Sequence, residues 1–247
     1  MTETIYLWKK EEYQYPCAGE FLPNITAYLH GDGQLRPAVL VVPGGGYVMV
    51  SPSEGEIVAK KFFEAGYQAF VLTYTTNMFQ LMPLGKQPLE DISRAVRYIR
   101  GHAEKLGVRE NQIACCGFSA GAHLVGSLAV HYQDPELKEE SGRQISNRPD
   151  AVLLCYPVIT SGEKAHRDSF VFLLGEEAEK EKLDWASIEK HVTKDAPPAF
   201  LWHTLTDGLV PPENSIYYMQ ACREAGVPCE LHLFMEGNHG MSLANED

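Results

Sequence analysis

The sequence has no long apolar segment and comparatively few basic residues. No window approaches the roughly 18–20 consecutive apolar residues that a membrane-spanning helix needs. The first five residues carry neither a basic segment nor the apolar run of a secretory signal, so we expect a cytoplasmic location and no membrane partner. The 21 Lys and Arg residues face 33 Asp and Glu residues, a formal charge of −12. Such a charge repels polyanions, so nucleic acid is not expected as a partner.

Cysteine pairs and internal repeats are also absent. The six cysteines form no C-x-x-C pair and no Cys/His spacing of the zinc type, so we expect neither a metal site nor a disulfide framework. No repeat of 20–50 residues and no break in composition divides the chain. With 45% apolar and 22% charged residues, residues 1–247 are expected to form one globular domain with a real core.

Strand and helix patterns alternate from about residue 37 onward. Continuous apolar, β-branched runs predict strands buried on both faces, and the helices show apolar residues at steps of three and four. The strands are expected at 37–43, 67–74, 112–117, 151–156, 199–203 and 229–234, and the helices at 53–65, 89–106, 120–132 and 212–225, with a short helix after His239. This alternation predicts an α/β fold with a mainly parallel sheet flanked by helices. Residues 5–8 and 25–29 read as short, half-exposed strands at an antiparallel edge.

One long segment interrupts the alternation. Residues 158–196 lie between the strands expected at 151–156 and 199–203, and they hold a charged run, 176–182, together with three aromatic side chains. A small insertion here forms either a lid over a site or a solvated surface excursion, and the sequence favours neither.

Gly117-Phe118-Ser119-Ala120-Gly121 is a G-x-S-x-G sequence that follows an expected strand and precedes an expected helix. A serine on such a tight turn projects its hydroxyl above the sheet, while the two glycines let the chain turn and let the helix approach closely. The backbone N–H of Ala120 then points from a helix N-terminus toward any oxygen bound nearby. The sequence therefore predicts Ser119 as a nucleophile.

Three glycines follow the strand expected at 37–43. Gly44, Gly45 and Gly46 leave backbone N–H groups uncovered by side chains. Such donors can stabilise the oxyanion of a tetrahedral intermediate, although a flexible turn would have the same composition. The position at a strand end favours the oxyanion interpretation.

The serine needs a base, and the base needs a carboxylate. Among nine histidines, His239 follows the last expected strand, where its side chain can reach the same edge of the sheet as Ser119. His203 ends the preceding strand and either lies near the site or is satisfied within the core. Asp207 follows that strand beside a glycine, and we choose it over Asp150, which precedes its strand, and over the other rivals, Asp184, Asp195 and Glu236. The order Ser119, Asp207, His239 is that of α/β-hydrolases.

The chain resembles α/β-hydrolases of the carbohydrate-esterase type, close to acetyl xylan esterase-like proteins. The matching segments are PGGGY at 43–47, GFSAGAHL at 117–124, HTLTDGLVPPENS at 203–215 and ELHLFMEGNHG at 230–240. The resemblance implies Ser119 as nucleophile, His239 as base, Asp207 as acid, and an oxyanion hole built from the amides of Gly45, Gly46 and Ala120. It implies no metal or organic cofactor.

The resemblance also has a departure. Hormone-sensitive-lipase-like esterases carry His where this chain has Pro43, and they bear an N-terminal cap for which 36 residues leave little room. We therefore expect no large cap and a shallow site for short acyl esters, acetyl first, with small-molecule esters such as acetylated carbohydrates as substrates. A serine peptidase, a formamidase and a non-catalytic binding protein on this scaffold remain alternatives, and the oligomeric state is left open.

Overall fold

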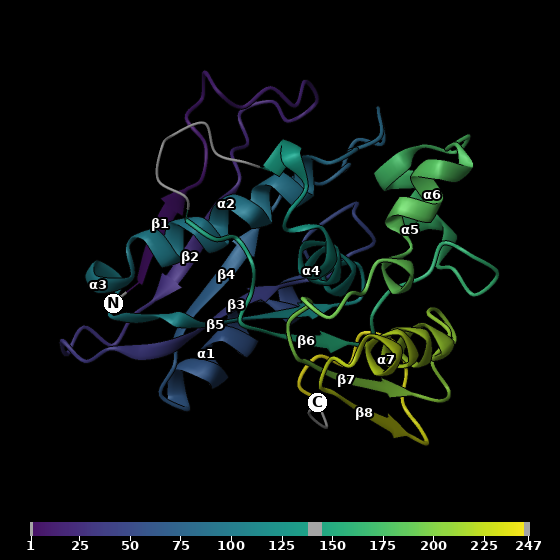
Figure 1. The fold of residues 1–247 in the computed structure, drawn as a ribbon. Coiled ribbons are helices and arrows are strands. Elements are labelled where there is room, and N and C mark those ends of the chain that lie inside the picture. The colour runs from purple at the N-terminus through teal and green to yellow at the C-terminus, as the bar shows by residue number, and fades with distance from the viewer. Residues whose placement is uncertain (1, 138–144, 245–247) are drawn as a thin grey trace.

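A single twisted sheet of eight strands forms the centre of the molecule (Figure 1). The computed structural model describes residues 2–137 and 145–244. The strands are β1 (Thr2–Tyr6), β2 (Asn24–Tyr28), β3 (Arg36–Val42), β4 (Gln68–Thr73), β5 (Val108–Phe118), β6 (Ala151–Cys155), β7 (Ala199–Thr204) and β8 (Cys229–Phe234). Their order across the sheet is β1-β2-β4-β3-β5-β6-β7-β8. The two N-terminal strands pair antiparallel and all later pairs are parallel, so the mainly parallel sheet with an antiparallel edge is confirmed.

Helices cover both faces of the sheet. The α-helices are α1 (Glu56–Glu64), α2 (Gln87–Gly101), α3 (Ala103–Leu106), α4 (Ala120–His131), α5 (Arg167–Leu174), α6 (Lys180–Ala186) and α7 (Glu213–Ala225), with short 3-10 helices at Pro52–Glu54, Pro135–Leu137 and Ile188–Lys190. In β3, Leu40 and Val42 belong to the core cluster under α2, α4 and α7, whereas Val39 and Val41 belong to the cluster under α1. A strand buried on both faces explains why its sequence is apolar without alternation.

Several element boundaries differ from the sequence expectations for local reasons. The helix expected at 89–106 is interrupted at His102, and α3 then ends at Gly107, whose φ of 66° is in the left-handed region. The helix expected at 53–65 is interrupted at Gly55, whose ψ of −99° is not helical, and the side chain of Glu54 before it turns inward to the Gly44 amide. Strand β5 begins four residues earlier than expected, where Val108 pairs with Arg36. Residues 240–244 form turns, so the short helix expected after His239 is not found within the described part of the chain.

The insertion at 158–196 packs against the body of the molecule through α5, α6 and the 3-10 helix at Ile188–Lys190 (Figure 1). The Nε2 atoms of His123 and His131, both on α4, lie 2.8 and 3.0 Å from the carbonyls of Ala186 and Trp185. On the other side, the side chain of Asn214 on α7 accepts hydrogen bonds from the amides of Ile159 and Thr160. These contacts fix the insertion beside the carboxyl edge of the sheet.

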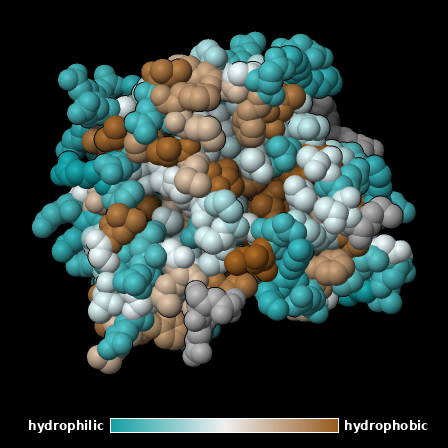
Figure 2. Space-filling view, turned by 180° about the vertical axis from the view of Figure 1, so that it is seen from behind, coloured by the Kyte–Doolittle hydropathy of each residue, from teal (hydrophilic) through white to brown (hydrophobic). Residues whose placement is uncertain are grey.

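The rear surface of the molecule is mixed in character. Figure 2 shows apolar residues scattered among hydrophilic ones rather than gathered in a continuous band. Among the described residues, no helix combines the length and the apolar character that crossing a bilayer requires.

Candidate active site

Ser119 occupies the sharp turn between β5 and α4. Its φ of 52° and ψ of −120° lie in a region that residues other than glycine rarely adopt. The turn is held by hydrogen bonds on both sides: the Ser119 amide donates to Cys155 O at 3.0 Å, and Ser119 O accepts from the amides of His123 and Val158 at 3.1 and 3.2 Å. The backbone around the hydroxyl is therefore fixed before any ligand binds.

The two glycines of the turn are required by close packing. A Cβ on Gly117 would lie 2.5 Å from Gly121 O, and a Cβ on Gly121 would lie 2.2 Å from Val42 O. Both distances are too short for real atoms, so the start of α4 sits directly against the ends of β5 and β3. This approach brings the helix N-terminus close to the Gly44–Tyr47 loop, which follows β3.

His239 joins the Ser119 hydroxyl to a carboxylate. Its Nε2 lies 2.7 Å from Ser119 Oγ, and its Nδ1 lies 2.7 Å from Asp207 Oδ2. Because a carboxylate only accepts, Nδ1 carries the hydrogen and Nε2 accepts from the serine hydroxyl. The imidazole stacks edge-on against Tyr156, with ring centroids 4.9 Å apart, and its side chain is 12% exposed. The structure thus brings together the three residues chosen from the sequence, in a linked chain of hydrogen bonds.

The Asp207 carboxylate is buried and has four donors. Oδ1 accepts from the amides of Leu209 and Val210, both at 2.9 Å, while Oδ2 accepts from His239 and from His203 Nε2 at 3.1 Å. Burial acts to raise the pKa of Asp207, but the hydrogen bonds from His203, His239 and the two amides outweigh it. The pKa of this carboxyl therefore lies well below its usual range, and Asp207 is ionised at neutral pH.

The loop Gly44–Tyr47 lies against Ser119 and is tied down at both ends. A Cβ on Gly44 would lie 2.8 Å from Ser119 Cβ, and the Gly44 amide donates to Glu54 Oε2 at 2.8 Å. At the other end, Tyr47 has a φ of 65° and is fully buried, its hydroxyl lies 2.7 Å from His123 Nδ1, and its carbonyl accepts from Asn77.

Three amides at this end of the sheet are left unpaired within the described chain. Across residues 2–137 and 145–244, the N–H groups of Gly45, Gly46 and Ala120 have no hydrogen-bond acceptor. Gly45 and Gly46 have φ values of 120° and 63°, and a Cβ on Gly45 would lie 2.2 Å from Met49 O. The glycines therefore meet a conformational need, and they leave their donors uncovered beside the serine.

A second buried carboxylate connects this loop with the loop that carries His239. Glu54 is 3% exposed, and its Oε1 accepts from the Tyr156 hydroxyl at 2.7 Å. The same hydroxyl accepts from the Ser242 amide at 2.9 Å. Burial and the Glu54 charge both raise the pKa of Tyr156, so the phenol stays protonated and remains a donor. Glu54, Tyr156 and His123 were not identified as site residues from the sequence, because only the folded chain brings them to the glycine loop.

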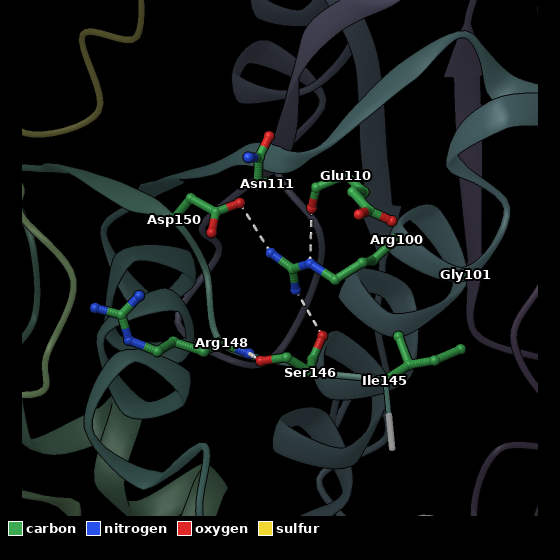
Figure 3. Close-up of a pocket in the computed structure, with 8 residues that line it drawn as sticks. All are labelled: Arg100, Gly101, Glu110, Asn111, Ile145, Ser146, Arg148 and Asp150. Atoms are coloured by element: carbon green, nitrogen blue, oxygen red, sulfur yellow. Dashed lines mark hydrogen bonds and ion pairs between the residues drawn. The ribbon is translucent and has the colours of Figure 1, made fainter. Parts of the chain in front are cut away.

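The rival carboxylates lie elsewhere. Asp150 is at the opposite end of the sheet, where its Oδ2 accepts from Arg100 and from the Ile113 amide, both at 2.8 Å. It lines a cavity of about 540 Å³, in which the guanidinium of Arg100 also donates to the carbonyls of Glu110 and Ser146 (Figure 3). Asp150 and Arg100 are therefore already paired within the chain, and their bonds join α2 and β5 to the segment that precedes β6. Asp184 is bound to Lys190, and Asp195 and Glu236 are exposed.

No metal centre is visible in the described residues, which contain no group of three or more His, Cys, Asp or Glu side chains placed to hold an ion. The six cysteines are free thiols. The chemistry that the geometry offers is transfer of the Ser119 proton to His239 Nε2, with Asp207 stabilising the imidazolium that forms.

The sheet order and the surrounding helices define the α/β-hydrolase fold. Several known proteins of similar sequence or structure are named as esterases, and one is named as a xylanase. The chain is 46% identical over 241 residues to endo-1,4-beta-xylanase B of Butyrivibrio fibrisolvens, covering 98% of this chain and 38% of that protein. It is 32% identical over 217 residues to an acetylxylan esterase of Xylanibacter ruminicola, covering 83% and 41%. This chain therefore spans about two fifths of the length of these two curated relatives.

Solved structures match over most of both chains. An acetyl ester-xyloside bifunctional hydrolase from Caldicellulosiruptor lactoaceticus superposes with a TM-score of 0.90 at 37% identity, covering 98% of this chain and 89% of that one. The carboxylesterase Cest-2923 from Lactobacillus plantarum superposes with a TM-score of 0.81 at 27% identity, covering 100% and 87%. Proteins named as esterases and carboxylesterases are thus among those that resemble this chain in sequence and in structure. The BD-FAE family model matches residues 27–221, and the chain belongs to the BD-FAE family.

The close approach at Gly121 gives a stability prediction. Replacing Gly121 by Ala should lower the free energy of unfolding by about 3 kcal/mol, because the added methyl group meets backbone atoms that cannot yield. Urea unfolding followed by circular dichroism measures the change. Gly208→Ala is the matched control, since no atom lies within 4 Å of its added Cβ, and it should shift stability by less than about 1 kcal/mol. Equal losses in the two variants would contradict the packing explanation.

The buried imidazole of His123 gives a pH prediction. Burial, only partly offset by the hydrogen bond to Ala186 O, lowers the pKa of His123 from 6.5 to about 4. Between these values the unfolded chain binds more protons than the folded one, so stability present above pH 6.5 is lost as the pH falls toward 4, by about 3 kcal/mol for this residue.

The slope of unfolding free energy against pH between 6.5 and 4.5 should become shallower in His123→Asn. Denaturant unfolding at several pH values measures it. His232→Asn, at an exposed position on β8, serves as the control and should retain the parental slope. An unchanged slope in the His123 variant would contradict the lowered pKa of His123.

Proposed function

We propose that this chain is a serine esterase that removes short acyl groups, acetyl first, from esters of carbohydrates. The observation that carries the proposal is the chain of two 2.7 Å hydrogen bonds from Ser119 Oγ through His239 to Asp207. The uncovered amides of Gly45, Gly46 and Ala120 beside the hydroxyl support an acyl-transfer site of this kind.

In the first half-reaction, Ser119 Oγ attacks the ester carbonyl while its proton passes to His239 Nε2. The carbonyl oxygen becomes an oxyanion, which accepts hydrogen bonds from the amides of Gly45, Gly46 and Ala120; each such donor is worth on the order of 3 kcal/mol to the transition state. The C–O bond to the alcohol then breaks, and His239 returns the proton to the leaving oxygen. The acyl group stays on Ser119.

In the second half-reaction, water attacks the acyl-enzyme. His239 takes one water proton and then returns it to Ser119 Oγ, so that the carboxylic acid leaves and the free hydroxyl is restored. Asp207, ionised because its pKa lies below the usual range, stabilises the imidazolium in both steps. Each step uses groups that this chain itself supplies.

The choice of acetyl groups on carbohydrates is supported by the names of similar proteins. The acetylxylan esterase of Xylanibacter ruminicola and the acetyl ester-xyloside bifunctional hydrolase of Caldicellulosiruptor lactoaceticus are both named for acetyl esters. A peptidase or formamidase would use the same serine, so the reaction must be tested on amides as well as esters.

Ser119→Ala should lower kcat for 4-nitrophenyl acetate by at least about 10⁴-fold, because the attacking oxygen is removed. Steady-state kinetics measures the loss, and mass spectrometry of the quenched wild-type reaction should show an acetyl group on Ser119. Ser127→Ala, on the same helix, should keep kcat within about twofold. Turnover retained in the Ser119 variant would overturn the nucleophile assignment.

A series of 4-nitrophenyl esters with acyl chains of two to twelve carbons should show the highest kcat/KM at two carbons. Each buried methylene would add about 0.8 kcal/mol of binding in an apolar channel, so a long-chain site would show rising values instead. Acetylated xylo-oligosaccharides should release acetate, whereas peptide amides and formamides should be turned over at least about 100-fold more slowly. An optimum at eight carbons would refute the short-acyl proposal.

A further inference from the structure

A second histidine contacts the Asp207 carboxylate. His203 is the penultimate residue of β7, and its side chain and that of Asp207 are both completely buried. His203 Nε2 lies 3.1 Å from Asp207 Oδ2, the same oxygen that accepts from His239 at 2.7 Å. One carboxylate oxygen is therefore shared by two imidazoles, one of which never reaches the solvent.

The surroundings of His203 place a hydrogen on its Nε2 atom. Nε2 faces two acceptors, Asp207 Oδ2 at 3.1 Å and Val210 O at 3.0 Å, so Nε2 must carry the hydrogen. Nδ1 lies 2.9 Å from the hydroxyl of Ser215, a buried residue in the first turn of α7 that can donate to it. A ring that carries its hydrogen on Nε2 thus satisfies every polar atom around it.

The position of His203 fixes the carboxylate against rotation. The amides of Leu209 and Val210 hold Oδ1, and His203 is the second donor to Oδ2 beside His239. Without His203, Oδ2 and Val210 O would each lose a donor in a buried site, and the carboxylate would depend on His239 alone for the orientation of that oxygen. The orientation of the His239 imidazole would then become less well defined.

We propose that His203 is a positioning residue of the esterase, which acts through Asp207: as an Nε2–H donor, it holds Oδ2 in line with His239 Nδ1 and shares the negative charge of that oxygen with His239. This inference rests on the proposed function, because it assigns Asp207 and His239 their roles in acyl transfer. The hydrogen bond from His203 draws electron density from Asp207 Oδ2, so this oxygen accepts a weaker hydrogen bond from His239. Its loss should therefore both loosen the geometry and let protonated His239 persist to higher pH.

Two amide substitutions separate positioning from packing. The side-chain nitrogen of His203→Gln can occupy the place of Nε2 and donate to Asp207, whereas the shorter side chain of His203→Asn reaches only the place of Nδ1, toward Ser215. We expect His203→Asn to lower kcat by about 10- to 100-fold with KM within twofold, and to move the acid limb of kcat/KM upward by at least about 0.5 pH unit. His203→Gln should recover most of kcat and return the limb to its parental position.

Rates are expressed per active site, titrated with a phosphonylating reagent that modifies the reactive serine, so that partial unfolding does not count as lost catalysis. His232→Asn, an exposed histidine on the neighbouring strand, is the matched control and should retain the parental kcat and pH profile. Equal kcat losses in the Asn and Gln variants, with an unmoved acid limb, would show that His203 only packs, and would overturn the proposal.

A measurement on the unmodified protein keeps the proposal testable if neither variant folds. With ¹⁵N-labelled histidine, the His203 resonances should show a hydrogen on Nε2 at pH 7, and an Nε2 without a hydrogen would overturn the proposal. Ser119→Ala is assayed in parallel. If the wild type hydrolyses no ester, or if Ser119→Ala remains active, the proposed function fails, while the resonances still decide whether His203 Nε2 carries a hydrogen.

Discussion

The hydrogen bond between the Ser119 hydroxyl and His239 Nε2 depends on the whole sheet, because it joins residues that are 120 positions apart and that follow β5 and β8. Strands β6 and β7 lie between those two, so the loop after β8 must run back over their ends. It is anchored on the way: Gly237 O accepts from the hydroxyls of Thr204 and Thr206, and the Gly237 amide donates to Thr206 Oγ1. The hydrogen bond between Ser119 and His239 forms because the parallel strands end at one edge of the sheet and because the loop after β8 is anchored at Gly237.

Most of the fold and three residues of the site could be predicted because their signals are local. A continuous apolar run such as β3 indicates a strand buried on both faces. A serine flanked by glycines between a strand and a helix indicates a tight turn with a restricted backbone conformation. Strand ends locate Asp207 and His239, since only loops at the carboxyl edge can meet. The interruption at Gly55 could not be predicted, because it accompanies a hydrogen bond from the Gly44 amide to Glu54, ten residues away, which helical periodicity does not encode.

The buried polar partners could not be predicted for the same reason. His203 lies in an apolar strand. The sequence there does not distinguish a core histidine that is hydrogen-bonded to its neighbours from a histidine that donates to a catalytic carboxylate. Its role becomes visible only when β7, the Asp207 loop and the first turn of α7 meet, because those three segments supply Asp207 Oδ2, Val210 O and the Ser215 hydroxyl. Two of the buried carboxylates lie at this site: Asp207 accepts a hydrogen bond from His239, and Glu54 joins the glycine loop through Tyr156 to the segment after His239.

The insertion at 158–196 is part of this arrangement. His123 spans the distance from the Tyr47 hydroxyl to Ala186 O, so one imidazole connects the glycine loop with the inserted helices. A chimaera that exchanges this insertion for one from another hydrolase would have to provide a carbonyl where Ala186 now stands. A graft chosen only for its length would leave a buried ring nitrogen without an acceptor and a strained tyrosine without its support, so the transplantable unit is the insertion together with Tyr47 and His123.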